Sequence, residues 1–260
     1  EEICEGDDGT FVATAADAHW VLWDFEGDGS SFPGGVGANS SWNYSNPGTY
    51  TVAVEVGMNN QSDACTATAY HDIVVKPAPT ADLALSESTG CEAMTVTATE
   101  LNGEGVDYEW TLPDGTNVTG PTSGPVELID VGVHAFAVTV TGSNGCVAVA
   151  NDYAEIFEAP TADFLVGDVC QGEVTSFTDM SLQAGTQNIT TWTWSFGDAE
   201  VSDERNPDHE YAGAGNYTVT LEVFDGQCTH DTIQMVEVFE APELTALSDV
   251  TDGCTPLLVA

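Results

Sequence analysis

The sequence predicts an all-β fold, built as a tandem array of small β-sandwich domains. One phrase, Ala-Pro-Thr-Ala-Asp, stands at residues 78–82 and again at 159–163, and Ala241-Pro242 starts a third copy. The spacing is 81 residues and then 82 (78 to 159, 159 to 241). A strand-like phrase that begins with Gly keeps the same period, at residues 48–56, 132–140 and 215–223. Such regular repetition is typical of an array of small domains and not of one large catalytic core.

These phrases set the expected domain boundaries. They divide the chain into domains at 1–78, 79–159 and 160–241, with the start of a fourth at 242–260. Only three residues precede Cys4, so we expect the first domain to lack its first strand and the chain to be a segment of a longer repeat protein. Domains of about 80 residues bury a modest core and often need a covalent staple as well.

Alternating hydrophobicity identifies the strands. In the phrase that starts at Gly48, the side chains of Tyr50, Val52, Val54 and Val56 share one face, and Thr, Ala and Glu take the other. Gly, Asn, Asp and Pro punctuate such runs at turn spacing, and no stretch has a helical period. Each repeat therefore consists of short strands joined by turns.

A second type of strand carries a Trp in every repeat. Its alternation assigns Trp23, Trp110 and Trp194 to the cores of the three domains. About seven short strands per repeat, with a Trp on the third, are typical of the immunoglobulin-like β-sandwich. We therefore predict a tandem array of immunoglobulin-like sandwiches of seven strands each.

Three linked motifs of the third domain resemble a known repeat. Trp194–Asp198 reads Trp-Ser-Phe-Gly-Asp, and Asn-Pro-Asp-His-Glu-Tyr and Gly-Asn-Tyr-Thr-Val follow at 206–211 and 215–219. Together they resemble the polycystic-kidney-disease (PKD) repeat, whose signature is Trp-x-Phe-Gly-Asp-Gly, Pro-x-His-x-Tyr and Gly-x-Tyr-x-Val. Ala199 replaces the last Gly of the first motif. The first domain is one residue longer there and has Trp42 in place of the His, and the second domain diverges most.

The resemblance implies a class of function. Similar repeats occur in giant surface adhesins of gliding bacteria, in archaeal surface-layer proteins and beside the catalytic domains of secreted hydrolases. The form with cysteines opening the second and last strands looks most like the surface adhesins. We expect a non-enzymatic, extracellular, cell-surface segment of an adhesin or filament, acting as a stiff acidic stalk. The alternatives are an accessory binding array of a secreted polysaccharide- or protein-degrading enzyme, and a surface-layer lattice protein.

Composition excludes several partners. Lys76 and Arg205 are the only Lys or Arg, against 43 Asp and Glu, for a net charge of −41. Nothing can neutralise phosphate, so nucleic acid and anionic membranes are poor partners. No apolar run is long enough to span a bilayer. The sequence also has no His-Glu-x-x-His, Gly-x-Ser-x-Gly or phosphate-binding Gly loop, which favours a protein that is not an enzyme.

Seven cysteines recur at two positions of the repeat. The position before the second strand holds Cys4, Cys91, Cys170 and Cys254. The position at the start of the last strand holds Cys65, Cys146 and Cys228. Regular placement without a metal-type Cys-x-x-Cys pair predicts disulfides, and therefore an oxidising compartment.

Two pairings of these cysteines are open. Pairing within each domain gives Cys4–Cys65, Cys91–Cys146 and Cys170–Cys228. However, the two turns lie at opposite ends of a seven-strand sandwich, roughly 25 Å apart, whereas a disulfide needs Cα atoms within about 7 Å. In a head-to-tail array the first turn of one domain faces the last turn of the next. This arrangement, which we favour, gives Cys4–Cys146 and Cys91–Cys228, and assigns Cys65, Cys170 and Cys254 to domains outside this chain.

One acidic turn is a candidate cation site. Some PKD repeats resemble Ca²⁺ sites at the loop after the second strand. In the second domain this loop places oxygen ligands at alternate positions, Glu100, Asn102 and Glu104. Hard cations such as Ca²⁺ prefer such ligands. The other interpretation is a solvated acidic turn, so Ca²⁺ is the one cofactor that we consider.

An apolar pair in the first domain is a candidate contact surface. Trp20 and Leu22 are out of phase with Trp23, so they should point away from the core. Either a loop or neighbouring domain covers them, or they form a lateral contact in a filament or a platform for a glycan. The expected partners are therefore neighbouring repeats, laterally assembled copies, and a glycan or other surface ligand.

Overall fold

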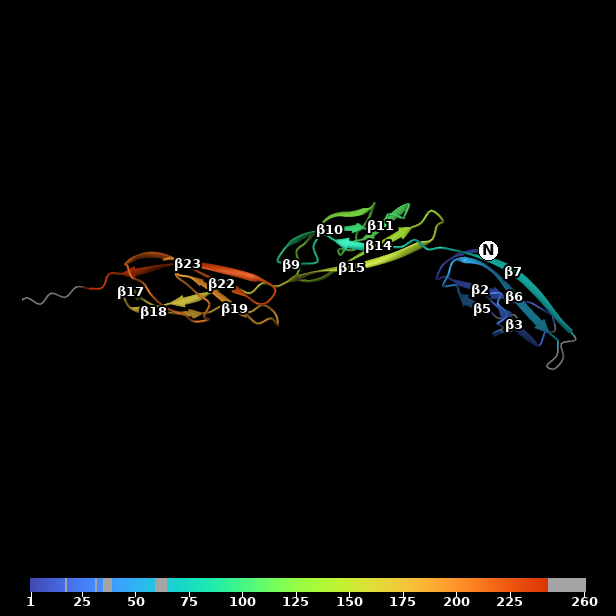
Figure 1. The fold of residues 1–260 in the computed structure, drawn as a ribbon, viewed down its shortest axis with the longest axis horizontal. Coiled ribbons are helices and arrows are strands. Elements are labelled where there is room, and N and C mark those ends of the chain that lie inside the picture. Colours follow the sequence, from blue (N-terminus) through green and yellow to red (C-terminus); the bar gives the residue numbers. More distant parts are fainter. Residues whose placement is uncertain (17, 31, 35–38, 59–64, 243–260) are drawn as a thin grey trace, which may run out of the picture. The chain divides into compact units, whose positions relative to one another are not determined.

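The computed structural model describes the chain apart from residues 17, 31, 35–38, 59–64 and 243–260. The described residues form β-strands joined by turns, without an α-helix (Figure 1). They accordingly include no helix long and apolar enough to cross a membrane. The chain divides into two compact units, Glu1–Ile156 and Phe157–Ala260, which are described separately. The predicted all-β fold is confirmed.

The first unit begins with a sandwich of two sheets. Its strands are β1 (Glu2–Cys4), β2 (Asp8–Val12), β3 (Trp20–Asp24), β4 (Phe32–Gly34), β5 (Asn39–Asn43), β6 (Gly48–Gly57) and β7 (Thr66–Lys76). One sheet has the order β1-β7-β6-β3-β4 and the other pairs β2 with β5. β1 runs parallel to β7, and the other pairs are antiparallel.

The second sandwich completes the first unit. Its strands are β8 (Leu83–Leu85), β9 (Thr89–Cys91), β10 (Met94–Glu100), β11 (Asp107–Thr111), β12 (Asn117–Thr119), β13 (Thr122–Leu128), β14 (Gly132–Thr141) and β15 (Val147–Phe157). The sheets have the orders β12-β11-β14-β15-β9 and β13-β10-β8.

The second unit holds the third sandwich. Its strands are β16 (Phe164–Val166), β17 (Val169–Cys170), β18 (Val174–Asp179), β19 (Thr191–Ser195), β20 (Val201–Ser202), β21 (Asp208–Glu210), β22 (Gly215–Phe224) and β23 (Thr229–Phe239). The sheets have the orders β17-β23-β22-β19-β20 and β16-β18-β21. The second and third sandwiches thus share one topology.

The opening strand is divided between the two sheets. In the third sandwich β16 pairs antiparallel with β18, whereas β17 runs parallel to β23 in the other sheet. The second sandwich repeats this division with β8 and β9, so both have eight strands where we predicted seven. In the described part of the first sandwich β1 corresponds to β9 and β17, and no strand corresponds to β8 and β16.

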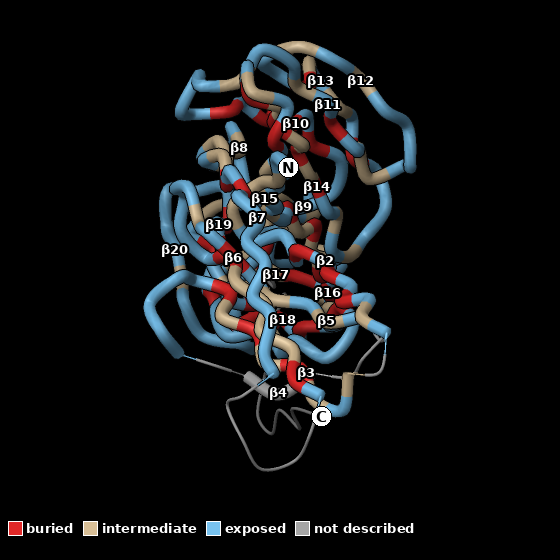
Figure 2. Tube along the Cα trace, turned by 90° about the vertical axis from the view of Figure 1, so that its right-hand side faces the viewer, coloured by how far each residue is buried: buried red, intermediate tan, exposed pale blue. Residues whose placement is uncertain are grey.

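Each sandwich has its own core. Trp23, Trp110 and Trp194 lie in three separate hydrophobic clusters, and none of the three exposes more than 4% of its surface. Buried and exposed positions alternate along the strands, as the colours of Figure 2 show. The period-2 alternation of the sequence therefore determines which face of each strand is buried.

The predicted domain boundaries can be placed on this fold. The boundary at 78/79 falls between β7 and β8, and that at 159/160 falls between β15 and β16. The predicted start of a fourth domain at 242–260 lies, apart from its first residue, outside the described residues.

Candidate functional site

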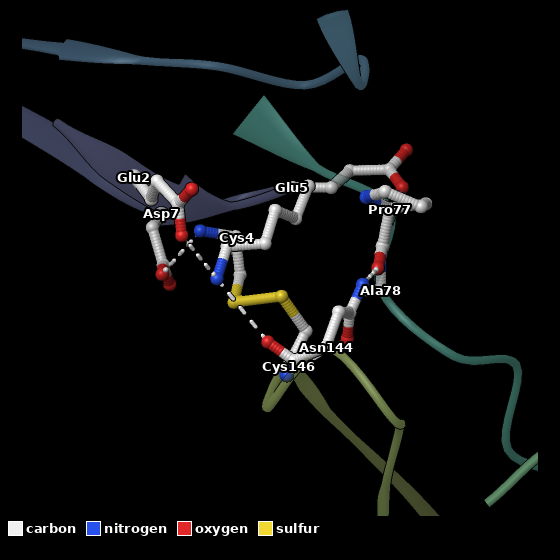
Figure 3. Close-up of a disulfide and its surroundings, with 9 residues drawn as sticks. Glu2, Cys4, Glu5, Asp7, Pro77, Ala78, Asn144 and Cys146 are labelled. Carbon is white, nitrogen blue, oxygen red and sulfur yellow. Dashed lines mark hydrogen bonds and ion pairs between the residues drawn. A yellow bond between two sulfur atoms is a disulfide. The ribbon is translucent and has the colours of Figure 1, made fainter. Parts of the chain in front are cut away.

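A disulfide joins the first two sandwiches. Cys4 ends β1 of the first sandwich, and Cys146 lies in the turn that precedes β15 of the second. Their Cα atoms are 5.6 Å apart, within the range of an ordinary disulfide. Figure 3 shows this bond beside the polypeptide segment Pro77-Ala78, which connects the same two sandwiches. The two sandwiches are therefore linked covalently at two places.

Asn144 connects the cysteine turn to the linker. Its Nδ2 donates a hydrogen bond of 2.7 Å to the carbonyl oxygen of Pro77. Its Oδ1 accepts one of 3.0 Å from the backbone N–H of Cys146 (Figure 3). One side chain thus fixes both the turn that presents Cys146 and the position of that turn against the linker.

Lys76 adds a charged contact to the same joint. Its Nζ lies 2.9 Å from Oε2 of Glu2 and donates a hydrogen bond of 3.2 Å to the carbonyl oxygen of Asn144. The hydrogen bond and the charge of Lys76 hold the pKa of the Glu2 carboxyl below its usual value. We name Glu2, Cys4, Lys76, Pro77, Asn144 and Cys146 the first joint.

Of the first joint, the sequence predicts only the two cysteines. Asn144 and Lys76 carry no motif, and only the folded chain shows that they meet. Lys76 nevertheless had a usable signal, because it is one of two strong cations and stands directly before Pro77. A lone cation at the boundary of an acidic repeat indicates a structural contact at that boundary.

The structure contradicts the alternative in which the cysteines pair within each domain. Because Cys4 bonds Cys146, neither Cys4–Cys65 nor Cys91–Cys146 forms, and Cys170 is a free thiol, so Cys170–Cys228 does not form. The reason is the length of the last strand. β7 pairs its final residue Lys76 with Cys4, while Cys65 precedes the other end of β7, about 35 Å away at ~3.3 Å per residue.

The other cysteines have definite states. Cys65 and Cys170 are free. Cys91 and Cys228 are oxidised to disulfides, and the pairing of Cys91 with Cys228 stays a prediction. In the described residues, one set of cysteines ends the strand that lies beside the last strand of its sandwich: Cys4 in β1, Cys91 in β9 and Cys170 in β17. The other set directly precedes the last strand: Cys65 before β7, Cys146 before β15 and Cys228 before β23.

The candidate calcium ligands are engaged in local hydrogen bonds. Oε1 and Oε2 of Glu100 accept hydrogen bonds from the backbone N–H groups of Asn102 (3.0 Å) and Gly103 (2.7 Å). Oε2 of Glu104 accepts one of 2.8 Å from the hydroxyl of Thr80. No group of three or more His, Cys, Asp or Glu that could hold a metal ion occurs in the part of the chain that the structure describes. The calcium site that the sequence suggests stays untested.

The apolar pair of the first sandwich, Trp20 and Leu22, is half-buried. Trp20 and Leu22 alternate along β3 with the buried Val21 and Trp23, so they lie on the outer face of the sheet. The indole of Trp20 lies over Gly57 of β6, where any Cβ would collide with the ring. The sheet itself therefore covers part of this surface.

Comparison with known proteins shows the family of these sandwiches. The family model described as PKD domain matches residues 157–239. The PKD1 domain of Epp from Vibrio anguillarum is 31% identical in a match that covers 33% of this chain and 99% of that domain, with a TM-score of 0.30. The chain belongs to the PKD domain family.

Two further PKD relatives come from one Vibrio cholerae protein. The PKD1 domain of the metalloprotease PrtV is 31% identical, in a match that covers 31% of this chain and 96% of that domain with a TM-score of 0.28. The curated pre-pro-metalloprotease PrtV of V. cholerae serotype O1 (strain M66-2) is 38% identical over 55 residues. Those residues are 21% of this chain and 6% of that protein, so the chain spans a small part of the length of this relative.

The PKD motifs of the third sandwich have a structural role. His209 stacks on Phe196 at 4.1 Å between ring centroids, and its Nε2 lies 2.8 Å from Oδ2 of Asp198. Burial alone would raise the pKa of Asp198, but hydrogen bonds from the N–H of Glu200 and from His209 outweigh it and hold the pKa below its usual value. The hydroxyl of Tyr211 donates to the carbonyl oxygen of Phe196 at 3.1 Å.

In the first sandwich another residue packs at the position of His209. Trp42, which stands where the motif has His, stacks on Phe25 at 5.2 Å. The hydroxyl of Tyr44 donates to the carbonyl oxygen of Phe25 at 3.0 Å, as that of Tyr211 does to Phe196. These motif residues therefore hold the core, and the PKD domain is a non-catalytic module.

Proposed function

We propose that this chain is a non-enzymatic repeat segment of a large cell-surface adhesin or filament, in which it acts as a stiff, acidic stalk. The observation that carries the proposal is the disulfide between successive sandwiches, Cys4–Cys146. Disulfides persist in oxidising, extracytoplasmic environments, which agrees with an extracellular location. PKD repeats joined only by a peptide linker would be free to hinge, whereas two covalent links resist bending.

The position of the disulfide suits a chain under tension. A pull on the two ends of the chain passes from Cys4 directly to Cys146, because the disulfide is the shorter covalent path. The bond spans 142 positions of the sequence, and the residues between its ends leave the path of the force. The first sandwich and most of the second then stay folded at loads that would unfold an unstapled domain.

The charge of the chain serves the same role. With 43 acidic residues and two strong cations, neighbouring stretches of the chain repel one another. This repulsion keeps an extended protein soluble and opposes its collapse at low salt, and it is screened as salt rises. Lateral assembly through the face that carries Trp20 and Leu22 would then need salt to screen this repulsion, because Glu55 lies opposite Leu22 on that face.

A second function is supported by a different observation. The match to the pre-pro-metalloprotease PrtV shows that a PKD domain of this type occurs in a much longer protease. An accessory binding array of a secreted polysaccharide- or protein-degrading enzyme is therefore the alternative proposal, and a surface-layer lattice protein is the third. Glycan arrays and negative-stain microscopy separate them: filaments support the first, glycan-binding particles the second and planar lattices the third.

The stalk proposal is tested by the flexibility of the first joint. Negative-stain images of the oxidised chain should show a narrow distribution of angles between the first two sandwiches. The double variant Cys4→Ser, Cys146→Ser should broaden it, because only the linker and its hydrogen bonds remain. Cys65→Ser is the matched control, since it removes a free thiol and should leave the distribution unchanged. Equal distributions for all three proteins would refute a stiffening role.

A further inference from the structure

The end of the third sandwich repeats the arrangement that holds Cys4, but with a free thiol. Cys170 ends β17 and pairs with Phe239 of β23, as Cys4 ends β1 and pairs with Lys76 of β7. Cys170 is half-buried and unbonded. The first joint therefore shows that a cysteine in this position can form a disulfide with the sandwich that follows in the chain.

The backbone around the two cysteines corresponds bond for bond. After Cys4 the hydrogen bonds are Glu5 N to Lys76 O (2.8 Å), Gly6 N to Tyr44 O (2.8 Å) and Asp7 N to Cys4 O (3.0 Å). After Cys170 they are Gln171 N to Phe239 O (2.9 Å), Gly172 N to Tyr211 O (2.9 Å) and Glu173 N to Cys170 O (3.2 Å). The first and third sandwiches thus hold their cysteines in the same way.

A second observation indicates what belongs opposite Cys170. The residue that ends the last strand contacts a cysteine turn in two cases. Nζ of Lys76 donates to the carbonyl oxygen of Asn144, two residues before Cys146. The carbonyl oxygen of Phe157, which ends β15, lies 3.9 Å from Sγ of Cys228. Phe239 ends β23 in the same way, and it is 51% exposed.

We propose that Cys170 and Phe239 form a docking site for the cysteine turn of another PKD sandwich, to which Cys170 becomes disulfide-bonded. The occupant is a turn of the kind that holds Cys146, and it comes from a sandwich that follows Phe239 in the same chain. The proposal rests on the stapled-array function and extends it, because it makes every sandwich a covalent acceptor for the next. Two thiols lose two protons and two electrons, and glutathione disulfide takes them up as two molecules of glutathione.

The test uses a chimeric chain. Residues 1–241 are followed by a second copy of residues 79–157, which keeps the natural Ala-Pro junction. After refolding with a glutathione redox buffer, peptide mapping without reduction should link Cys170 to the Cys146 of the appended copy. The chimera with Cys170→Ser should leave that appended Cys146 open to alkylation. Recovery of a free Cys170, or of Cys170 linked to the Cys91 of the appended copy, would overturn the proposal.

A kinetic comparison tests the role of Phe239. Phe239→Ser in the chimera should slow formation of the Cys170 disulfide several-fold, because docking no longer raises the local concentration of the turn. Tyr153→Ser, at an equally exposed aromatic residue on β15, is the control and should not change the rate. Equal rates of disulfide formation for the two variants would show that Phe239 is not part of the docking site. The Cys4–Cys146 link of each chimera serves as the internal standard: its loss would refute the stalk proposal, whereas failure of Cys170 alone refutes only this inference.

Discussion

His209 is held by a ring and a carboxylate at the same time. Its side chain is 4% exposed and stacks on Phe196, and Oδ2 of Asp198 accepts a hydrogen bond from its Nε2 at 2.8 Å. Glu200 approaches Nδ1 at 3.6 Å from the exposed side. The imidazole is therefore a packing element whose polar edge is satisfied, which explains why a His at this position of the motif needs no catalytic role.

The first prediction concerns this His. His209→Ala leaves a cavity beside Phe196 and an unpaired Asp198, so the third sandwich should lose about 3 kcal/mol of stability. Hydrogen exchange of the amides in β19 and β22 measures this sandwich alone. Glu200→Gln is the matched control, because Glu200 is mostly exposed, and it should change the stability by less than about 0.5 kcal/mol. A similar small effect of both variants would contradict the packing role.

The second prediction concerns alkaline pH. Burial, with the charge of Glu26 nearby, raises the pKa of Tyr44 to about 12. The folded state thus favours the protonated phenol, and its stability is complete below the unfolded pKa of about 10 and is lost as pH rises towards 12. Tyr44→Phe should cost about 1 kcal/mol at pH 7, for the lost hydrogen bond to Phe25, and should flatten this alkaline decline.

Urea unfolding of the first sandwich between pH 7 and pH 11 measures both effects. Tyr70→Phe is the control, because it removes a phenol hydroxyl from an exposed side chain of the same sandwich. An alkaline decline that is the same in Tyr44→Phe and in the unmodified chain would assign the effect to another group.

Single residues differ in how well the sequence predicts them. Trp23, Trp110 and Trp194 were predictable because strict alternation determines the face of a strand. The contacts of Glu100 and Glu104 were not predictable, because a carboxylate in a turn can bind either a cation or nearby N–H or O–H donors. In the folded chain both carboxylates accept hydrogen bonds from such donors. The spacing of the acidic residues alone does not determine which of the two kinds of contact forms.

At the scale of the element, one turn explains a motif and its variant. Gly197 has φ = +86°, and a Cβ there would lie 2.7 Å from the carbonyl oxygen of Thr218. In the first sandwich Gly27, at φ = +74°, approaches Thr51 in the same way, although its motif is one residue longer. Ala199 takes φ = +79°, the left-handed region where the family signature has Gly.

The third prediction is a matched pair of substitutions in this turn. Gly197→Ala should destabilise the third sandwich by about 3 kcal/mol, through backbone strain and the collision with Thr218. Ala199→Gly should stabilise it by about 0.5–1 kcal/mol, because relief of the strained φ exceeds the entropy that Gly loses on folding. Thermal unfolding, followed together with hydrogen exchange in β22, measures both. Effects of the same sign would contradict this account of the turn.

Elements were predictable to the extent that they are long. The alternation in β6, β14 and β22 extends over ten residues each, which is enough to define a strand and its face. β8 and β16 have three residues each, and β17 has two, too few for any period. The division of the opening strand between two sheets was therefore invisible in the sequence, and a count of seven strands followed.

At the scale of the whole molecule, charge and metal binding can be separated. A net charge of −41 attracts cations diffusely, which screens repulsion without a defined site. A bound Ca²⁺ at Glu100, Asn102 and Glu104 would have to displace hydrogen bonds that both carboxylates already accept.

The fourth prediction is a weak calcium affinity. Isothermal titration in 0.15 M salt should give no saturable heat tighter than about millimolar affinity. Glu104→Gln is the matched variant and should titrate like the unmodified chain. Micromolar binding that Glu104→Gln abolishes would establish the calcium site that the sequence suggested and would contradict this expectation.

We propose that covalent bonds join successive PKD sandwiches and carry the load along the chain. Single-molecule extension of the chain by its two ends tests it most directly, in a Cys91→Ser, Cys228→Ser background that isolates Cys4–Cys146. Adding reductant should lengthen the fully extended chain by about 500 Å, since 142 positions at ~3.5 Å each rejoin the path of the force. A gain of only about 200 Å, which a Cys4–Cys65 bond would give over 61 positions (65 − 4), or no gain at all, would contradict it.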